Sequence, residues 1–154
     1  MKDYSFQSFG LEHIFYLLIC ISVWFFLPLI GRRYASQSQQ RNIVLALISV
    51  TLLQELLHYF YKINLNSFDP AKDISLHMCG FSLFISCYAL YTRNQTAFEL
   101  SFFWGLAGAL QAILSTDPTR FYFGYISTLW SFLSHGLIIL NVFWMIFVYL
   151  FMTF

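Results

Sequence analysis

The chain has 154 residues, of which 59% are hydrophobic and 21% aromatic, while only 10% are charged. A soluble domain usually carries roughly 25% charged residues, and a domain this small lacks the interior to hide so much apolar surface. With a net charge of +1, no long basic run and no glycine-rich phosphate loop, the sequence gives no indication of nucleic-acid binding. These properties predict an integral membrane protein.

Apolar runs follow one another along the whole chain, separated by short polar connections. Each run is close to the roughly 20 residues that a helix needs to cross the hydrocarbon core. Only helices satisfy their own backbone polar groups there without closing into a barrel. We therefore predict an all-α, polytopic membrane bundle of about five helices in a single domain, residues 1–154, with spans at roughly 14–30, 43–61, 74–91, 98–114 and 126–152.

The connection after the first span carries the densest group of basic residues, Arg32, Arg33 and Arg41, and no acid. By the positive-inside rule we expect this loop in the cytoplasm and the N-terminus outside, in a multi-pass protein of the bacterial inner membrane. The cysteines are odd in number, and all lie inside apolar runs. This pattern does not predict a disulfide framework.

Polar residues inside the apolar runs concentrate at one side of the membrane. Consecutive helices alternate in direction, so the ends of the second and fourth spans share a membrane face with the starts of the others. Ionisable groups in a span are costly and therefore suggest a function. We predict a polar cavity that opens to this side, lined by Gln54, Glu55, His58, Gln111 and Asp117.

Cys79 lies near the predicted start of the third span, two residues after His77. The dipole of a helix N-terminus favours a thiolate, and a nearby protonated histidine would favour it further. This is the environment of an activated nucleophile. The alternative is that Cys79 is a small apolar packing residue, as most membrane cysteines are.

His135 lies deep in the last run and must have a polar partner there. It is a candidate base for Cys79, a metal ligand across helices, or a hydrogen-bond donor to another helix. No pair of histidines stands at i and i+4, and no Cys-x-x-Cys motif occurs. We accordingly predict no metal site and no cofactor.

Three segments resemble the YwaF-like family of bacterial membrane proteins, which is similar to the eukaryotic transmembrane protein 164 family. They are Leu-His-Met-Cys at 76–79, the Gly-x-x-Gly-Ala-x-Gln-Ala stretch at 105–112 that runs into Thr-Asp-Pro at 116–118, and Ser-His-Gly at 134–136. They occur in the expected order, and the resemblance covers roughly residues 54–140. The middle segment is the most specific of the three.

The resemblance implies a fatty-acyl transfer between phospholipids, with membrane lipids as partners; a lipid hydrolase that uses the same residues is the alternative enzyme. Cys79 would carry the acyl group, and His135 would be the base, with His77 as a second candidate. Family members usually continue with further spans after the Ser-His-Gly helix, whereas this chain ends at Phe154 inside an apolar run. We therefore expect a shortened member, either inactive alone or completed by a second copy or a partner membrane protein.

Two other functions remain open from the sequence. In the first, Glu55, His58, His77 and His135 form a proton or ion relay in a transporter or small-molecule binding protein. No inverted repeat and no pair of broken helices supports it. In the second, the polar residues only hold helices together in a non-catalytic assembly partner.

Overall fold

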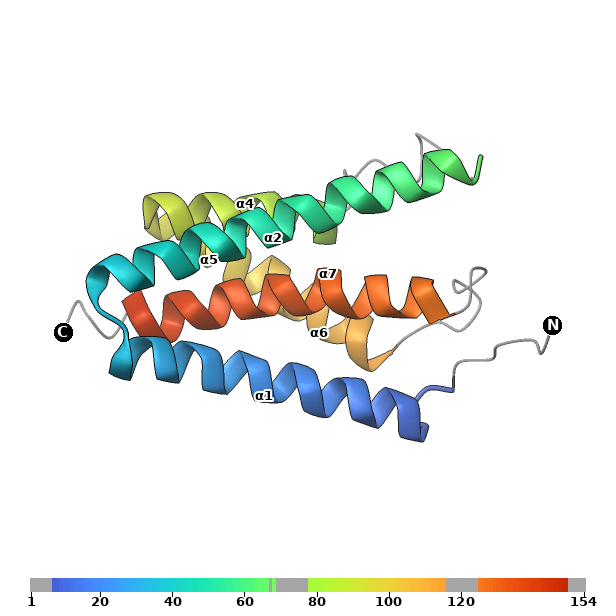
Figure 1. The fold of residues 1–154 in the computed structure, drawn as a ribbon, viewed down its shortest axis with the longest axis horizontal. Helices are drawn as coiled ribbons and strands as arrows, with labels where there is room; N and C mark the ends of the chain where they lie inside the picture. Colours follow the sequence, from blue (N-terminus) through green and yellow to red (C-terminus); the bar gives the residue numbers. More distant parts are fainter. Residues whose placement is uncertain (1–6, 67, 69–77, 116–124, 150–154) are drawn as a thin grey trace.

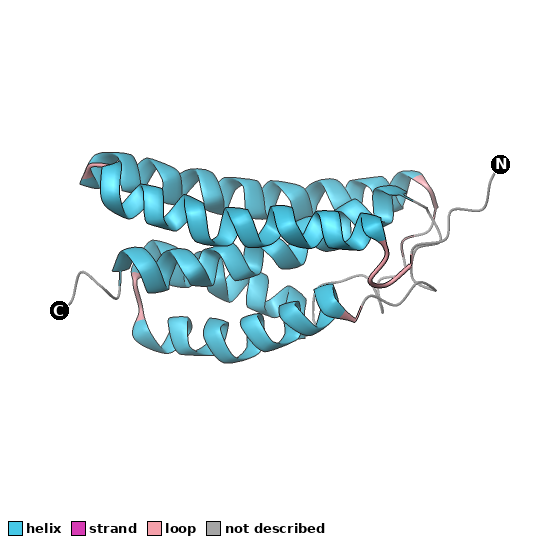
Figure 2. Cartoon of the chain, turned by 90° about the horizontal axis from the view of Figure 1, so that it is seen from below, coloured by secondary structure: helices cyan, strands magenta, loops and turns pink. Residues whose placement is uncertain are grey.

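The computed structural model describes residues 7–66, 68, 78–115 and 125–149, and within these ranges the chain is helical and contains no strand (Figure 2). Four of the helical stretches are long and apolar enough to cross a membrane, and a shorter apolar helix, Met78–Thr92, accompanies them. The predicted all-α bundle of about five membrane helices is confirmed.

The first helix, α1, covers Leu11–Tyr34, and α2 covers Gln37–Asn64. Both extend beyond the predicted spans, because polar residues at their ends continue the helix outside the hydrocarbon core. Hydropathy locates the apolar part of a helix and not its ends. The third helix, α4, covers Met78–Thr92, and the predicted span residues before it lie outside the described part of the chain.

The fourth stretch is one continuous helical rod made of three segments. It consists of α5 (Gln95–Leu100), a π-helical segment η1 (Ser101–Leu106) and α6 (Ala107–Leu114). The last stretch is α7 (Tyr125–Trp144), continued by the π-helical segment η3 (Met145–Tyr149). π-Helical turns are rare, and many of those known lie at functional sites. The presence of η1 therefore makes this part of the fourth stretch a candidate neighbour of a functional site.

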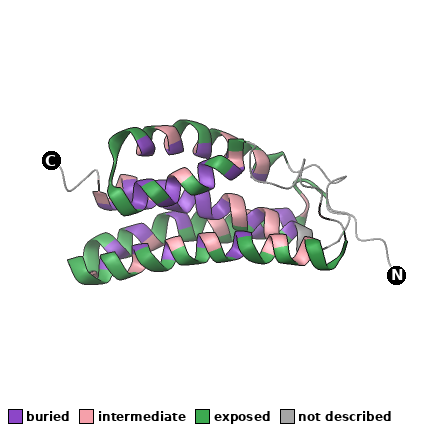
Figure 3. Cartoon of the chain, turned by 90° about the horizontal axis from the view of Figure 1, so that it is seen from above, coloured by how far each residue is buried: buried purple, intermediate pink, exposed green. Residues whose placement is uncertain are grey.

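The helices alternate in direction. In Figure 1 α7 runs between α1 and α2, with α6 behind α7 and α4 behind α2. In the most apolar part of Thr128–Tyr149, 61% of the residues are buried, against 22% to 28% in the most apolar parts of the other long stretches. The outer helices instead carry many exposed apolar side chains (Figure 3). Such side chains face lipid in a membrane, so α7 is the central helix and α1 and α2 are peripheral.

A short turn joins α1 to α2 and is fixed by side chains. Ser36 accepts a hydrogen bond from the backbone N–H of Gln39, whose side chain accepts one from the N–H of Ser36, forming a capping box. The buried Gln40 amide donates to the carbonyl oxygens of Gly31 and Ala35, at 3.2 Å each. The carbonyl oxygen of Gly31 also accepts from the backbone N–H of Ala35 at 3.3 Å, so the Gln40 amide adds a second donor to Gly31 and supplies one to Ala35, just after the end of α1.

Replacing Gln40 by leucine is expected to destabilise the bundle by about 1 kcal/mol, because the carbonyl oxygen of Ala35 loses its side-chain donor and that of Gly31 keeps only the backbone N–H of Ala35. Thermal unfolding in detergent measures the change. Gln37→Leu, at an exposed position in the same turn of α2, is the matched control and should leave the transition in place. An unchanged transition in Gln40→Leu would show that the turn tolerates the loss of the Gln40 hydrogen bonds.

Candidate functional site

Cys79 is the second residue of α4 and is half-buried against α6. A β-carbon placed on Gly108 would lie 3.2 Å from its sulfur atom, which is tighter than an ordinary contact. The glycine therefore provides the room that the thiol occupies. The close contact with Cys79 is a physical reason for a glycine at position 108 of the 105–112 motif.

His135 lies on α7, half-buried, with its Nδ1 atom 2.8 Å from the carbonyl oxygen of Ser131. A carbonyl oxygen only accepts hydrogen bonds, so Nδ1 carries the proton and donates. In the neutral ring this leaves Nε2 as the basic nitrogen. The backbone of α7 thus orients His135 and fixes its tautomer, as an acceptor does for a catalytic histidine in a hydrolase triad.

His13, fully buried near the start of α1, has the opposite tautomer. Its Nδ1 accepts from the backbone N–H of Phe9, and its Nε2 lies 2.8 Å from the carbonyl oxygen of Ile113. Nε2 must therefore carry the proton and donate, so both ring nitrogens are engaged. His13 joins the start of α1 to the end of α6 through its hydrogen bond to Ile113. Because both ring nitrogens are engaged, neither is available as a base for catalysis.

The contacts of α4 with α7 show that the two helices run parallel. Gly105 is packed between them: a β-carbon there would lie 3.6 Å from Cβ of Ser82 and 2.9 Å from Cγ2 of Ile138. About one turn further along both helices, Ser86 and Asn141 are joined by a hydrogen bond of 3.1 Å. Residue 82 therefore lies level with residue 138, and residue 86 with residue 141.

The same register continues in the other direction. Cys79 is one turn before Ser82 on α4, and His135 is one turn before Ile138 on α7. Residues three or four apart share a helix face, and α6 runs antiparallel to α7. The register brings Cys79 and His135 to one level of the bundle, the level of Gly108.

The residues predicted to line a polar cavity have different surroundings in the structure. Gln54 and Glu55 are buried, with the Gln54 amide 3.4 Å from Oε2 of Glu55, and His58 packs against the ring of Trp130 at 5.7 Å. Gln111 is exposed on α6 and does not join them. His77 and Asp117 lie outside the described residues.

A buried polar cluster in the middle of the bundle was not identified from the sequence. Asn141 on α7 donates to Ser86 on α4 and to Thr51 on α2. The signal for Asn141 was present, since an amide deep in an apolar run is as costly as a histidine there. Thr51 and Ser86 gave no such sequence signal, because serine and threonine hydroxyl groups commonly bond to a carbonyl oxygen of their own helix.

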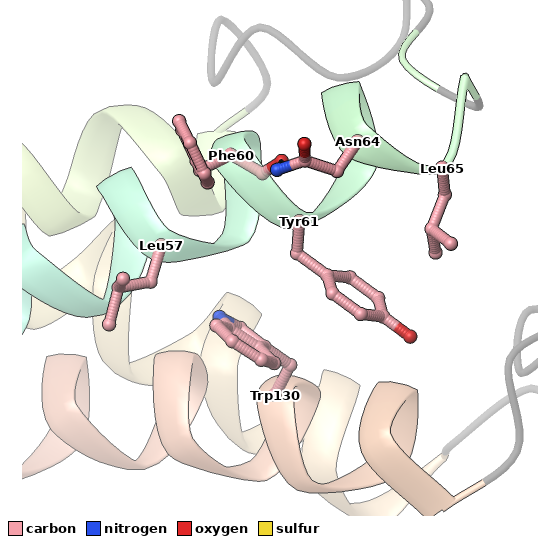
Figure 4. Close-up of a pocket in the computed structure, with 6 residues that line it drawn as sticks. All are labelled: Leu57, Phe60, Tyr61, Asn64, Leu65 and Trp130. Carbon is pink, nitrogen blue, oxygen red and sulfur yellow. Dashed lines mark hydrogen bonds between the residues drawn. The ribbon is translucent and has the colours of Figure 1, made fainter.

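A groove of about 350 Å³ opens between α2 and α7 (Figure 4). The rings of Tyr61 and Trp130 are stacked there, with centroids 5.8 Å apart and planes at 14°. Trp130 donates from its indole nitrogen to the carbonyl oxygen of Gln54 at 3.1 Å, which fixes its ring. The other lining residues are Leu57, Phe60, Asn64 and Leu65, so the walls are mostly apolar.

Comparison with known proteins identifies the family. Searches of curated proteins and of solved structures give no match to this chain. A sequence model of the TMEM164 family matches residues 8–152, which is nearly the whole chain and includes Cys79, the 105–112 motif and His135. The resemblance to the transmembrane protein 164 family is thereby confirmed, and this chain is a membrane protein of the TMEM164 family.

Proposed function

We propose that this protein is a membrane-embedded lipid acyltransferase in which Cys79 is the nucleophile and His135 the general base. The observation that carries the proposal is the level register of two parallel helices, with Cys79 on one and His135 on the other. The hydrogen bond from Nδ1 of His135 to Ser131 supports it, because that bond leaves Nε2 as the proton acceptor.

In the first half-reaction the sulfur of Cys79 attacks the carbonyl carbon of a lipid ester, and its proton passes to Nε2 of His135. The ester C–O bond breaks, and His135 returns the proton to the leaving alcohol oxygen, which releases a lysolipid. In the second half-reaction His135 takes the proton of an acceptor hydroxyl, whose oxygen attacks the thioester. The C–S bond breaks, and Cys79 regains its proton from His135.

Access from the bilayer supports a lipid substrate. The groove at Tyr61 and Trp130 has apolar walls, and Leu57 and Phe60 on its rim are 49% and 67% exposed. An acyl chain can lie against such walls without losing polar contacts. Because its motifs resemble bacterial proteins, we place the enzyme in a bacterial inner membrane, where phospholipids surround it on all sides.

The proposal is tested by trapping the acyl group on the protein. Purified protein in liposomes is incubated with a phosphatidylcholine whose acyl chain is deuterated, together with an unlabelled lysophospholipid acceptor. The lipids are then analysed by mass spectrometry for acyl exchange, and acid-quenched protein is digested to locate any thioester. We expect exchange in the lipid pool and a labelled acyl group on the peptide that contains Cys79.

Cys79→Ala is the first control and should abolish both signals, since the thioester has no sulfur to form on. Cys20→Ala is the matched control, because Cys20 is also half-buried in a membrane helix but lies beside Gly136 on the α1 side of α7. It should retain both signals. Exchange that survives Cys79→Ala would overturn the assigned nucleophile, and a folded wild-type protein without exchange would favour a binding or assembly role.

A further inference from the structure

Asn141 is the polar link among three helices at the centre of the bundle. Its side chain is fully buried, and its amide nitrogen lies 3.1 Å from Oγ of Ser86 on α4 and 3.4 Å from Oγ1 of Thr51 on α2. Both amide hydrogens are thus directed at neighbouring helices. The amide oxygen of Asn141 has no hydrogen-bond partner within the described residues, so its contribution to the packing comes from the donor side.

The two hydroxyl groups are held in place by their own helices. Ser86 donates to the carbonyl oxygen of Leu83 at 2.8 Å, and Thr51 donates to that of Leu47 at 2.7 Å. With its proton directed at its own helix, each hydroxyl presents lone pairs to Asn141. Ser86 and Thr51 are therefore acceptors fixed in position, and a shift of α7 along either helix would break the bond.

The side chains packed next to Asn141 are mainly apolar. One other hydrogen bond between the two helical stretches, from the Tyr149 hydroxyl on η3 to the carbonyl oxygen of Leu90 at 3.3 Å, lies about two turns further along, at the far end from Cys79 and His135. The buried neighbours Leu83 and Leu90 on α4 and Ile138 and Val142 on α7 belong to one hydrophobic cluster, except that Asn141 interrupts it. Apolar contacts are not directional, and inside a membrane no hydrophobic force drives helices together. They set how closely helices approach, but a directional bond is needed to select one axial register.

We propose that Asn141 is a positioning residue: through its hydrogen bond to Ser86 it fixes the register of α7 against α4 and so holds His135 level with Cys79. The bond lies about two helical turns from that pair. Because α4 and α7 are parallel and each is one continuous helix between the two points, a shift of α7 along its axis at Asn141 moves His135 by the same distance relative to Cys79. The role of this register in catalysis rests on the proposed function. The register itself is a property of helix packing and can be measured without any reaction.

Disulfide trapping measures the register directly. In a Cys20→Ala background, a single cysteine is introduced at 132, 135 or 139, positions one turn apart on α7. Mild oxidation in liposomes is followed by mass spectrometry of the peptides linked to Cys79. We expect cysteine at 135 to link about tenfold faster than at 132 or 139, because a shift of one turn exceeds the distance that a disulfide spans.

Ser86→Ala should then reduce the preference for position 135 by about three- to tenfold, the range that one interhelical hydrogen bond supports inside a membrane. Thr51→Val is the matched control, since it removes the bond to α2 but leaves the bond between α4 and α7. It should keep the preference. Ser86→Thr, which retains the hydroxyl group, should restore it.

The activity of the same variants separates positioning from general structure. Acyl exchange by Ser86→Ala should show a lower kcat with an unchanged KM and recover in Ser86→Thr. An unchanged linking preference in Ser86→Ala overturns the positioning role while leaving the acyltransferase proposal intact. Conversely, a lost preference in a protein without any acyl exchange supports the register and counts against the proposed function.

Discussion

Replacing His135 by glutamine is expected to lower the rate of acyl exchange by about 10²- to 10⁴-fold, the usual contribution of a positioned general base. Glutamine fills similar space, and its amide can still donate to the carbonyl oxygen of Ser131, as Nδ1 of His135 does. It has no basic nitrogen, so it cannot accept the thiol proton. The loss should therefore concern catalysis and not the packing of α7.

Initial rates of exchange in liposomes, at saturating lysolipid, measure the effect. Ser131→Ala is the matched control on α7, because the hydrogen bond to His135 uses the backbone oxygen of Ser131 and survives the substitution. It should retain activity close to wild type. His135→Gln with an unchanged rate and an unchanged thermal transition would exclude His135 as the base.

The fold was predictable from the sequence because lipid imposes a simple rule. A run of about 20 apolar residues has to be a helix, and short connections force neighbours to be antiparallel. The rule does not reveal where a helix changes character inside an apolar run. The π-helical turns at Ser101–Leu106 and Met145–Tyr149 depend on packing against neighbours, so hydropathy alone does not detect them.

The sequence predicts how deep each candidate residue lies along its helix, but it does not predict whether the side chain faces the interior of the bundle or its surface. The alternation of helix directions predicts Gln54, Glu55 and Cys79 in one half of the membrane; the structure buries Gln54 and Glu55 and leaves Cys79 half-buried. Gln111 has a suitable depth but an exposed position, because the face that a helix turns inward is decided by its packing. For α6 that face is marked by Ala109 and Ile113, which are almost fully enclosed.

The distinction between the histidines also required the structure. In the sequence His13 and His135 are both imidazoles at the edge of, or within, an apolar run. Only their hydrogen bonds show that Nε2 of His13 joins α1 to the end of α6 while its Nδ1 accepts from Phe9, whereas Nδ1 of His135 donates to the carbonyl oxygen of Ser131 on its own helix. Tautomers depend on partners far away in the sequence, such as the carbonyl oxygen of Ile113.

Gly31→Ala is expected to destabilise the bundle by about 3 kcal/mol, the upper part of the usual range for overpacking. A β-carbon at this position would lie 2.5 Å and 2.8 Å from Cη2 and Cζ3 of Trp144. The indole of Trp144 is fully enclosed, so it cannot move away as a flexible side chain at the surface would. The clash should exceed the gain of roughly 1 kcal/mol that alanine brings to a helix.

Equilibrium unfolding in mixed micelles measures the change, with Gly136→Ala as the matched control. There a β-carbon would meet Cys20 at 3.6 Å and Trp24 at 3.9 Å, which are ordinary contacts, so this variant should be neutral or slightly more stable. In a double-mutant cycle, Trp144→Phe should recover most of the loss caused by Gly31→Ala, because the smaller ring vacates the space next to residue 31. Independent effects of the two substitutions would mean that α1 moves away from Trp144 instead, and the close packing of α1 on the central helix would not limit stability.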